Sequence, residues 1–118
     1  MLKKEISKID SVAQKAGRGV SMKMLISTDE AEHFAMRQFS IDVDGFMPLH
    51  TNTVEHEQFV LQGRAKVVVG DETFEAKKGD VLYIPAGVAH MYETLGDEAY
   101  EFLCLVPKKD DVISVISC

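Results

Sequence analysis

The chain has 118 residues, 46% of them hydrophobic, and carries a net charge of -6 from 19 acidic and 13 basic side chains. This length suits one hydrophobic core, and the composition is typical of a folded globular protein, not of a disordered or fibrous one. The acidic balance repels phosphate backbones and anionic lipid heads. We therefore expect neither a nucleic acid nor a membrane as a partner.

The termini and cysteines indicate the compartment. No apolar run approaches the roughly 20 residues that span a bilayer, and the N-terminal stretch MLKKEISKIDSV lacks the apolar core of a signal peptide. The cysteines are a poor disulfide framework, because Cys104 lies in an apolar run and Cys118 is the last residue. These features predict a cytoplasmic protein with two reduced thiols.

Short β-type runs broken by turn residues dominate the chain. The chain has two weak helical signals, KKEISKIDSVAQKA and STDEAEHF, and the second predicts one turn of helix. The connections DVDG, GR, GDE, KKGD, PAG and LGDE carry Gly, Asp or Pro, as tight turns require. Strands this close leave no room for crossover helices, so the sheet is predicted to be antiparallel, in a sandwich or barrel. The predicted strands are residues 20–27, 34–42, 46–50, 57–62, 65–69, 73–76, 81–84, 90–94, 100–106 and 112–116.

Two spaced motifs bring histidines to these strands. In residues 45–63, His50 and Asn52 stand two residues apart, so both point to the same face of a strand, and His56 follows after a short turn. In GDVLYIPAGVAH, residues 79–90, a strand enters a Pro-Gly turn that delivers His90 to the next strand. The remaining histidine, His33, lies in an acidic loop and is expected to be an ordinary surface residue.

The two motifs together resemble those of the cupin superfamily over roughly residues 45–94. The resemblance implies an all-β fold, an antiparallel double-stranded β-helix or jelly-roll barrel. It implies one domain over residues 1–118, with a barrel core at about 34–106, an N-terminal arm at 1–33 and a C-terminal strand at 112–118.

The resemblance also implies one divalent metal ion per chain, either Fe, Mn, Ni, Cu or Zn, held by His50, His56 and His90. Asn52 departs from the family pattern, since it replaces the second histidine of a His-x-His pair, and Thr94 replaces a common asparagine. An amide oxygen binds these metals more weakly than an imidazole. We therefore expect Asn52 to be a weak fourth ligand or a hydrogen-bond donor to bound water. The alternative is a polar network of histidines without a metal.

Strand alternation predicts further pocket residues. Gln58 shares the face of His56, Tyr92 shares the face of His90, and Phe102 and Cys104 share one face of the last barrel strand. These four are expected to line a pocket for a small-molecule ligand. The ordinary alternatives are a polar residue on a wet face for Gln58, a barrel plug for Tyr92 and a buried hydrophobe for Cys104.

Several functions remain open, because the resemblance implies dioxygenases, isomerases, lyases and decarboxylases alike. Apart from Tyr92, no general base stands out beside the ligands, which favours a metal-dependent, dioxygenase-like oxidoreductase over a sugar isomerase or lyase. No catalytic residue is assigned. The second hypothesis is a non-catalytic cupin that binds a small ligand or a metal. The apolar tail DDVISVISC and the exposed strand edges predict a homodimer in which terminal strands cover each other.

Overall fold

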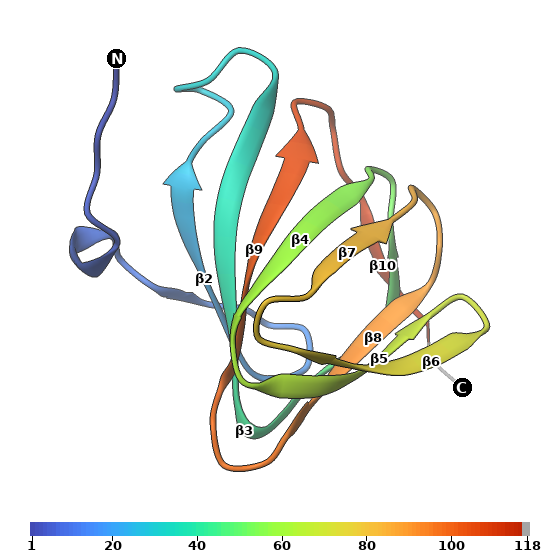
Figure 1. Ribbon diagram of the computed structural model, residues 1–118. Coiled ribbons are helices and arrows are strands. Elements are labelled where there is room, and N and C mark those ends of the chain that lie inside the picture. The colour runs from blue at the N-terminus through green and yellow to red at the C-terminus, as the bar shows by residue number, and fades with distance from the viewer. Residues whose placement is uncertain (117–118) are drawn as a thin grey trace.

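The computed structural model describes residues 1–116, and its regular structure is almost entirely strand (Figure 1). In those residues the one helical element is the short 3-10 turn η1 (Ile6–Lys8), and no helix is long and apolar enough to cross a membrane. The prediction of an all-β antiparallel barrel is confirmed. The strands are β1 (Val12–Ala13), β2 (Arg18–Ile26), β3 (Phe34–Asn52), β4 (His56–Gln62), β5 (Arg64–Val69), β6 (Glu72–Lys77), β7 (Val81–Ile84), β8 (His90–Leu95), β9 (Tyr100–Pro107) and β10 (Ile113–Val115).

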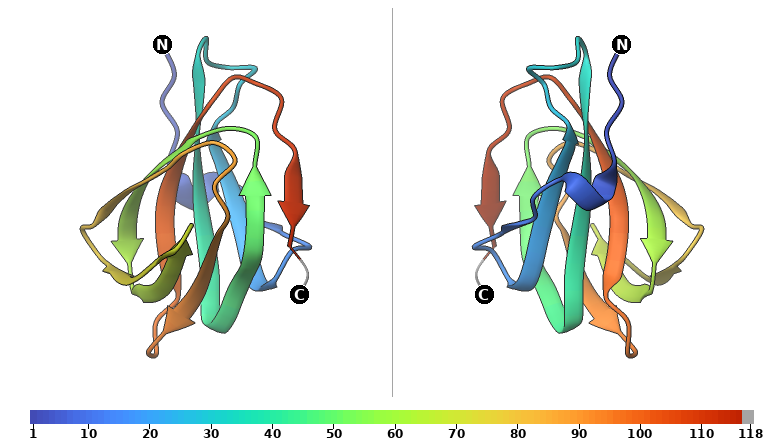
Figure 2. Two further views of the ribbon diagram at one scale, coloured as in Figure 1. Left: turned by 90° about the vertical axis from the view of Figure 1, so that its right-hand side faces the viewer. Right: turned by 90° about the vertical axis from the view of Figure 1, so that its left-hand side faces the viewer.

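A single antiparallel sheet curls on itself to form the barrel, and β3 runs through both halves of it. The first part of β3 pairs with β2 and β9, and the sheet continues from β9 through β4 to β7. The end of β3 pairs with β8 and β10, and the sheet continues from β8 through β5 to β6. Figure 2 shows β10 standing beside the end of β3. The last residues of the predicted strand at 112–118, including Cys118, lie outside the described part.

β3 is one long strand, where the sequence predicted two strands separated by a turn at DVDG. Val20 of β2 lies opposite Ile41, but Arg18 lies opposite Phe46, so the extra residues of β3 form a bulge. Asp44 sits in this bulge with a φ of 64°, a left-handed conformation that aspartate tolerates better than most residues. The bulge lets the chain change direction without leaving the sheet.

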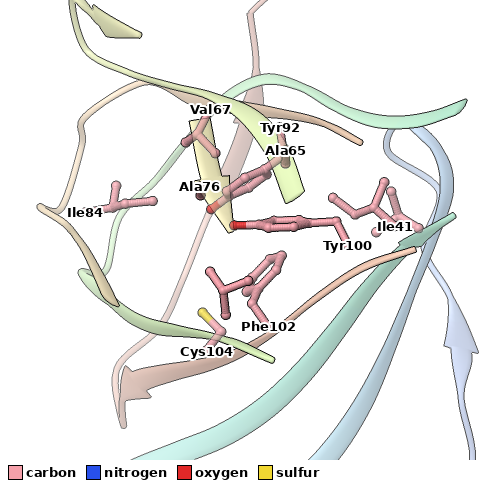
Figure 3. Close-up of a cluster of buried hydrophobic side chains, with 11 residues drawn as sticks. Ile41, Ala65, Val67, Ala76, Ile84, Tyr92, Tyr100, Phe102 and Cys104 are labelled. Carbon is pink, nitrogen blue, oxygen red and sulfur yellow. The ribbon is translucent and has the colours of Figure 1, made fainter. Parts of the chain in front are cut away.

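Inward-pointing side chains fill much of the barrel (Figure 3). The rings of Tyr92, Tyr100 and Phe102 pack together with centroids 5.2 to 6.3 Å apart, a separation typical of favourable aromatic contacts. Tyr92 also contacts His50 and His90, with centroid distances of 6.5 and 5.8 Å. Tyr92 therefore marks the boundary between the apolar core and a polar region of the lumen.

Candidate functional site

The polar region of the lumen encloses a cavity of about 70 Å³. It is bordered mainly by side chains from β3, β4, β8 and β9, together with Gln14, Met22 of β2 and Ile113 of β10. The eight residues singled out in the sequence all line this cavity, although their roles in binding stay predictions: His50, Asn52, His56, Gln58, His90, Tyr92, Phe102 and Cys104.

The three motif histidines come from three different strands. His50 and His90 lie opposite each other on β3 and β8, with ring centroids 4.1 Å apart. His56 begins β4 and lies 5.6 Å from His90 by the same measure. Gly87 has a φ of 79° and donates its backbone N–H to the Asn52 carbonyl at 2.8 Å. This bond fastens the Pro-Gly turn to the end of β3 and thereby sets the position of His90.

Backbone hydrogen bonds orient two of these rings. Nδ1 lies 2.7 Å from the Pro48 carbonyl oxygen in His50 and 2.9 Å from the Val88 carbonyl oxygen in His90. A carbonyl oxygen can only accept, so Nδ1 carries the proton in both rings and Nε2 keeps a free lone pair. Nε2 of His90 and Nε2 of His56 are buried without a hydrogen-bond partner. Imidazoles held in this way by a backbone acceptor are typical metal ligands.

Burial keeps the three histidines neutral at physiological pH. It lowers the pKa of His50, and it lowers the pKa of His90 to about 4 despite the opposing effect of the Val88 carbonyl. Burial, followed by the positive charge of Arg37, lowers the pKa of His56 to about 3. The neutral form is the one that coordinates metal ions, so these rings need not lose a proton to bind one.

Asn52 is oriented by a residue that the sequence analysis did not single out. Its Nδ2 donates to Oδ2 of Asp111 at 3.0 Å, and the same carboxylate accepts the backbone N–H of Thr53 at 2.9 Å. A carboxylate can only accept, so the amide nitrogen faces Asp111 and Oδ1 is left buried without a partner. Asn52 was expected to be either a weak fourth metal ligand or a hydrogen-bond donor to bound water. This orientation supports the first role, because the amide oxygen is the atom left free to bind a metal ion.

Two glutamates flank His56 in the sequence, and neither lines the lumen. Glu57 is exposed, as the alternation of strand side chains predicts, while His56 and Gln58 are buried. Glu55 accepts a hydrogen bond from the hydroxyl of Tyr83 at the surface. The candidate ligands are therefore neutral donors only.

Beyond the histidines, the cavity carries a second polar group of side chains. Gln58 Nε2 donates to the Tyr92 hydroxyl at 2.7 Å, and Gln58 Oε1 is buried without a partner. Cys104 is a free buried thiol, as predicted, and accepts a long hydrogen bond of 3.4 Å from Nη2 of Arg37. Arg37 was also missed in the sequence analysis. Thr94 donates to the Ile41 carbonyl at 3.0 Å, which is a structural contact.

A metal ion in the lumen would need several donor atoms that can reach one point. In the described chain, residues 1–116, no three His, Cys, Asp or Glu side chains already form an arrangement that could hold an ion. The chemistry of the donors nevertheless fits: three neutral imidazoles and one amide oxygen share a cavity, and three of these groups have a buried atom without a partner. Imidazole nitrogens that share an ion stand about 3 Å apart. The three rings must therefore change position for all of them to bind one ion.

A compact jelly-roll barrel with histidines in its lumen defines the structural class, and comparison with known proteins gives the family. The chain belongs to the Cupin domain family, which matches residues 38–106. The family predicted from the two motifs is thereby confirmed.

Several proteins of known sequence or structure are similar to this chain. An uncharacterized protein of Methanocaldococcus jannaschii is 31% identical over 68 residues, covering 52% of this chain and 54% of that protein. The 1-methylthio-D-xylulose 5-phosphate methylsulfurylase of Rhodospirillum rubrum is 29% identical over 76 residues, covering 64% and 49%. These matches span about half the length of each relative. The structure of the polyketide cyclase RemF from Streptomyces resistomycificus has a TM-score of 0.91 and 24% identity, covering 100% of this chain and 87% of RemF, a likeness of fold.

Proposed function

We propose that the barrel binds one divalent transition metal ion through His50, His56 and His90, with Oδ1 of Asn52 as a weaker fourth donor. The observation that carries this proposal is the pair of buried, unpartnered Nε2 atoms on His56 and His90. A buried polar atom without a partner costs about 1 to 3 kcal/mol. A shared ion would remove that cost from both rings at once.

The side chains around the histidines support a binding site for a small organic molecule. A bound metal would orient the oxygen atoms of such a molecule and polarise them as a Lewis acid. Gln58 Oε1 has no partner in the protein and is free to accept a hydrogen bond from a ligand. The rings of Phe39 and Phe102 stack at 5.5 Å with an interplanar angle of 17° and form an apolar wall for a flat group.

The same side chains favour a reaction centred on the metal over one that needs a protein base. Burial raises the pKa of Tyr92 well above its ordinary value and raises the pKa of the Cys104 thiol. Both groups therefore stay protonated at neutral pH and serve as hydrogen-bonding groups, not as proton acceptors. This supports a dioxygenase-like oxidoreductase over a sugar isomerase or lyase, both of which require a base to move a proton.

Elemental mass spectrometry on untagged protein, purified without a chelator, tests the metal. We expect nearly one Fe, Mn, Ni, Cu or Zn per chain in the wild type, a large loss in His56→Ala, and no loss in His33→Ala, whose imidazole is exposed on a loop. No metal in the purified protein, and none taken up on reconstitution, would refute the metal site.

Oxygen uptake then separates an enzyme from a binding protein. The metal-loaded protein is mixed with chelating organic acids and diols, and dissolved oxygen is followed with an electrode. Uptake that requires both the metal and the organic molecule supports the dioxygenase-like enzyme. A ligand that binds without being consumed supports the second hypothesis, a non-catalytic cupin.

We also propose a homodimer formed through the terminal strands. Within the described chain, β10 pairs with β3, yet Val112, Ile113 and Val115 each leave more than half of their surface exposed. A second copy would cover these apolar side chains. Light scattering should give twice the mass of 13.1 kDa, and a monomer would contradict the proposal.

A further inference from the structure

One charged side chain in the lumen has no part in the proposed metal site. Arg37 lies opposite Cys104 in the pairing of β3 with β9, and its side chain borders the same cavity as the histidines. Its guanidinium carbon lies 5.1 Å from the centre of the Phe39 ring. This aromatic contact and the thiol of Cys104 hold the guanidinium at the cavity wall.

Arg37 is partly buried and has no carboxylate partner in the described part of the chain. No ion pair in residues 1–116 includes Arg37, and its Nε is buried without a hydrogen-bond partner. Its one hydrogen bond goes to Cys104 Sγ, which is a weak acceptor. Even partial burial of a guanidinium without a matching carboxylate costs free energy, and the contacts with Phe39 and Cys104 offset part of that cost.

The charges of the side chains that line the cavity also favour an anionic ligand. No Asp or Glu of the described chain is among the side chains that line it, and the three histidines are neutral. The carboxylate of Asp111 is not part of this lining and is hydrogen-bonded to Asn52 and Thr53, although its negative charge still acts on the three histidines. Arg37 is therefore the one permanent charge on the cavity wall of a protein whose net charge is -6. An anion entering the lumen meets a local positive charge.

We propose that Arg37 recognises the carboxylate of a small organic acid whose adjacent oxygen atom faces the histidines. The planar fork of a guanidinium matches the two oxygens of a carboxylate, and the Phe39 ring favours a fixed orientation of that fork. The cavity of about 70 Å³ limits the ligand to a few heavy atoms. This inference rests on the proposed use of the lumen as a ligand site and assigns its ligand class.

Oxamate and oxamide test this inference because they have nearly the same shape and the same pair of adjacent carbonyl groups, while oxamate alone carries a charge. Isothermal titration calorimetry measures both dissociation constants for the wild type, Arg37→Met, Arg37→Lys and Arg18→Met. The last variant removes an exposed arginine of β2 and serves as the matched control. Circular dichroism confirms that each variant is folded.

We expect the wild type and Arg18→Met to prefer oxamate by about tenfold to a hundredfold, the range of a charge-assisted hydrogen-bonded pair. Arg37→Met should lose most of this preference, the remainder coming from the attraction of the bound metal ion for an anion, and Arg37→Lys should keep more of it. An unchanged preference in Arg37→Met, or no oxamate binding by the wild type, would overturn the inference.

Metal content measured on the same samples separates this inference from the proposed function. Protein without metal that still selects oxamate through Arg37 would refute the metal site and leave the role of Arg37 intact. Arg37→Met with normal metal content and an unchanged preference would refute the role of Arg37 and leave the metal site intact.

Discussion

Acidification of the metal-free protein should destabilise the barrel through its buried histidines. The pKa values of His56 and His90, about 3 and about 4, lie well below the ordinary value of 6.5. The unfolded chain therefore binds protons at these rings near pH 6.5, while the folded chain does not. The stabilisation is fully present above about pH 6.5 and is lost as the pH falls from 6.5 towards the folded values.

The expected magnitude follows from the same two histidines. Between pH 7 and pH 5 each ring should remove about 2 kcal/mol from the free energy of unfolding, because the unfolded ring becomes protonated and the folded ring stays neutral. Together they account for about 4 kcal/mol, a large part of the 5 to 15 kcal/mol typical of a domain. The lowered pKa of His50 acts in the same direction.

Urea denaturation followed by far-ultraviolet circular dichroism, in a chelating buffer at pH 7, 6 and 5, measures this effect. His56→Gln should reduce the loss of stability over this interval by about 2 kcal/mol. His33→Gln should leave it unchanged, since the His33 side chain is exposed. If His56→Gln and the wild type lose stability in parallel, the ring of His56 is not held neutral by burial and the reasoning is wrong.

Two matched pairs of substitutions test the packing of the barrel, with urea denaturation at pH 7 as the measurement. Tyr100→Phe should be neutral or slightly stabilising, because it removes a buried hydroxyl without a partner. Tyr92→Phe should cost about 1 kcal/mol, because it removes the short hydrogen bond of the Gln58 amide and leaves that amide with only the distant Cys104 Sγ at 3.9 Å. Equal effects of the two tyrosine variants would contradict the assigned hydrogen bonds. Gly79→Ala should lower the free energy of unfolding by about 1 to 2 kcal/mol. Gly79 has a φ of 93°, which is unfavourable for alanine, but the added Cβ would meet no other atom. Gly63→Ala should lower the free energy of unfolding more than Gly79→Ala, since its Cβ would lie 2.4 Å from a backbone oxygen. An equal loss in the two variants would show that the backbone moves to relieve this clash.

The antiparallel all-β character of the fold could be predicted because its signals are local in the sequence, whereas the jelly-roll barrel itself was implied by the resemblance to the cupin superfamily. Each tight connection carries turn residues, and the strands between them are too short and too close for crossover helices. Strand alternation also gave the correct inward faces, as His56 and Gln58 of β4 are buried while Glu57 is exposed. These signals depend on neighbouring residues alone, so no knowledge of the tertiary structure was needed.

The bulge in β3 depends on pairing between strands and could not be predicted in the same way. DVDG has the composition of a hairpin turn, and in isolation it would be expected to reverse the chain. In the barrel, β2 and β8 both pair with the segment around it, so the hydrogen bonds of the sheet keep the strand continuous. Asp44 adopts a left-handed conformation in the bulge that the extra residues form.

Arg37 shows why a pocket residue can be missed even on a predicted strand. It shares the inward face with Ala35, Phe39 and Ile41, a pattern present in the run FAMRQFSID. The outward face of the same run also carries two apolar residues, Phe34 and Met36, so alternation did not decide which set points into the barrel. The burial of Ala35 and Ile41 decides it, and Arg37 then belongs to the lumen.

Asn52 shows how a distant segment changes the meaning of a motif. Judged by residue type alone, an asparagine in place of a histidine weakens a metal site. The bond from its amide nitrogen to Asp111 leaves the oxygen as the group without a partner in the cavity. Asp111 lies 59 residues further along the chain, in the irregular segment before β10, where no local pattern marks it. The donors available in such a site depend on what neighbouring side chains leave unpaired, and that information exists only once the chain is folded.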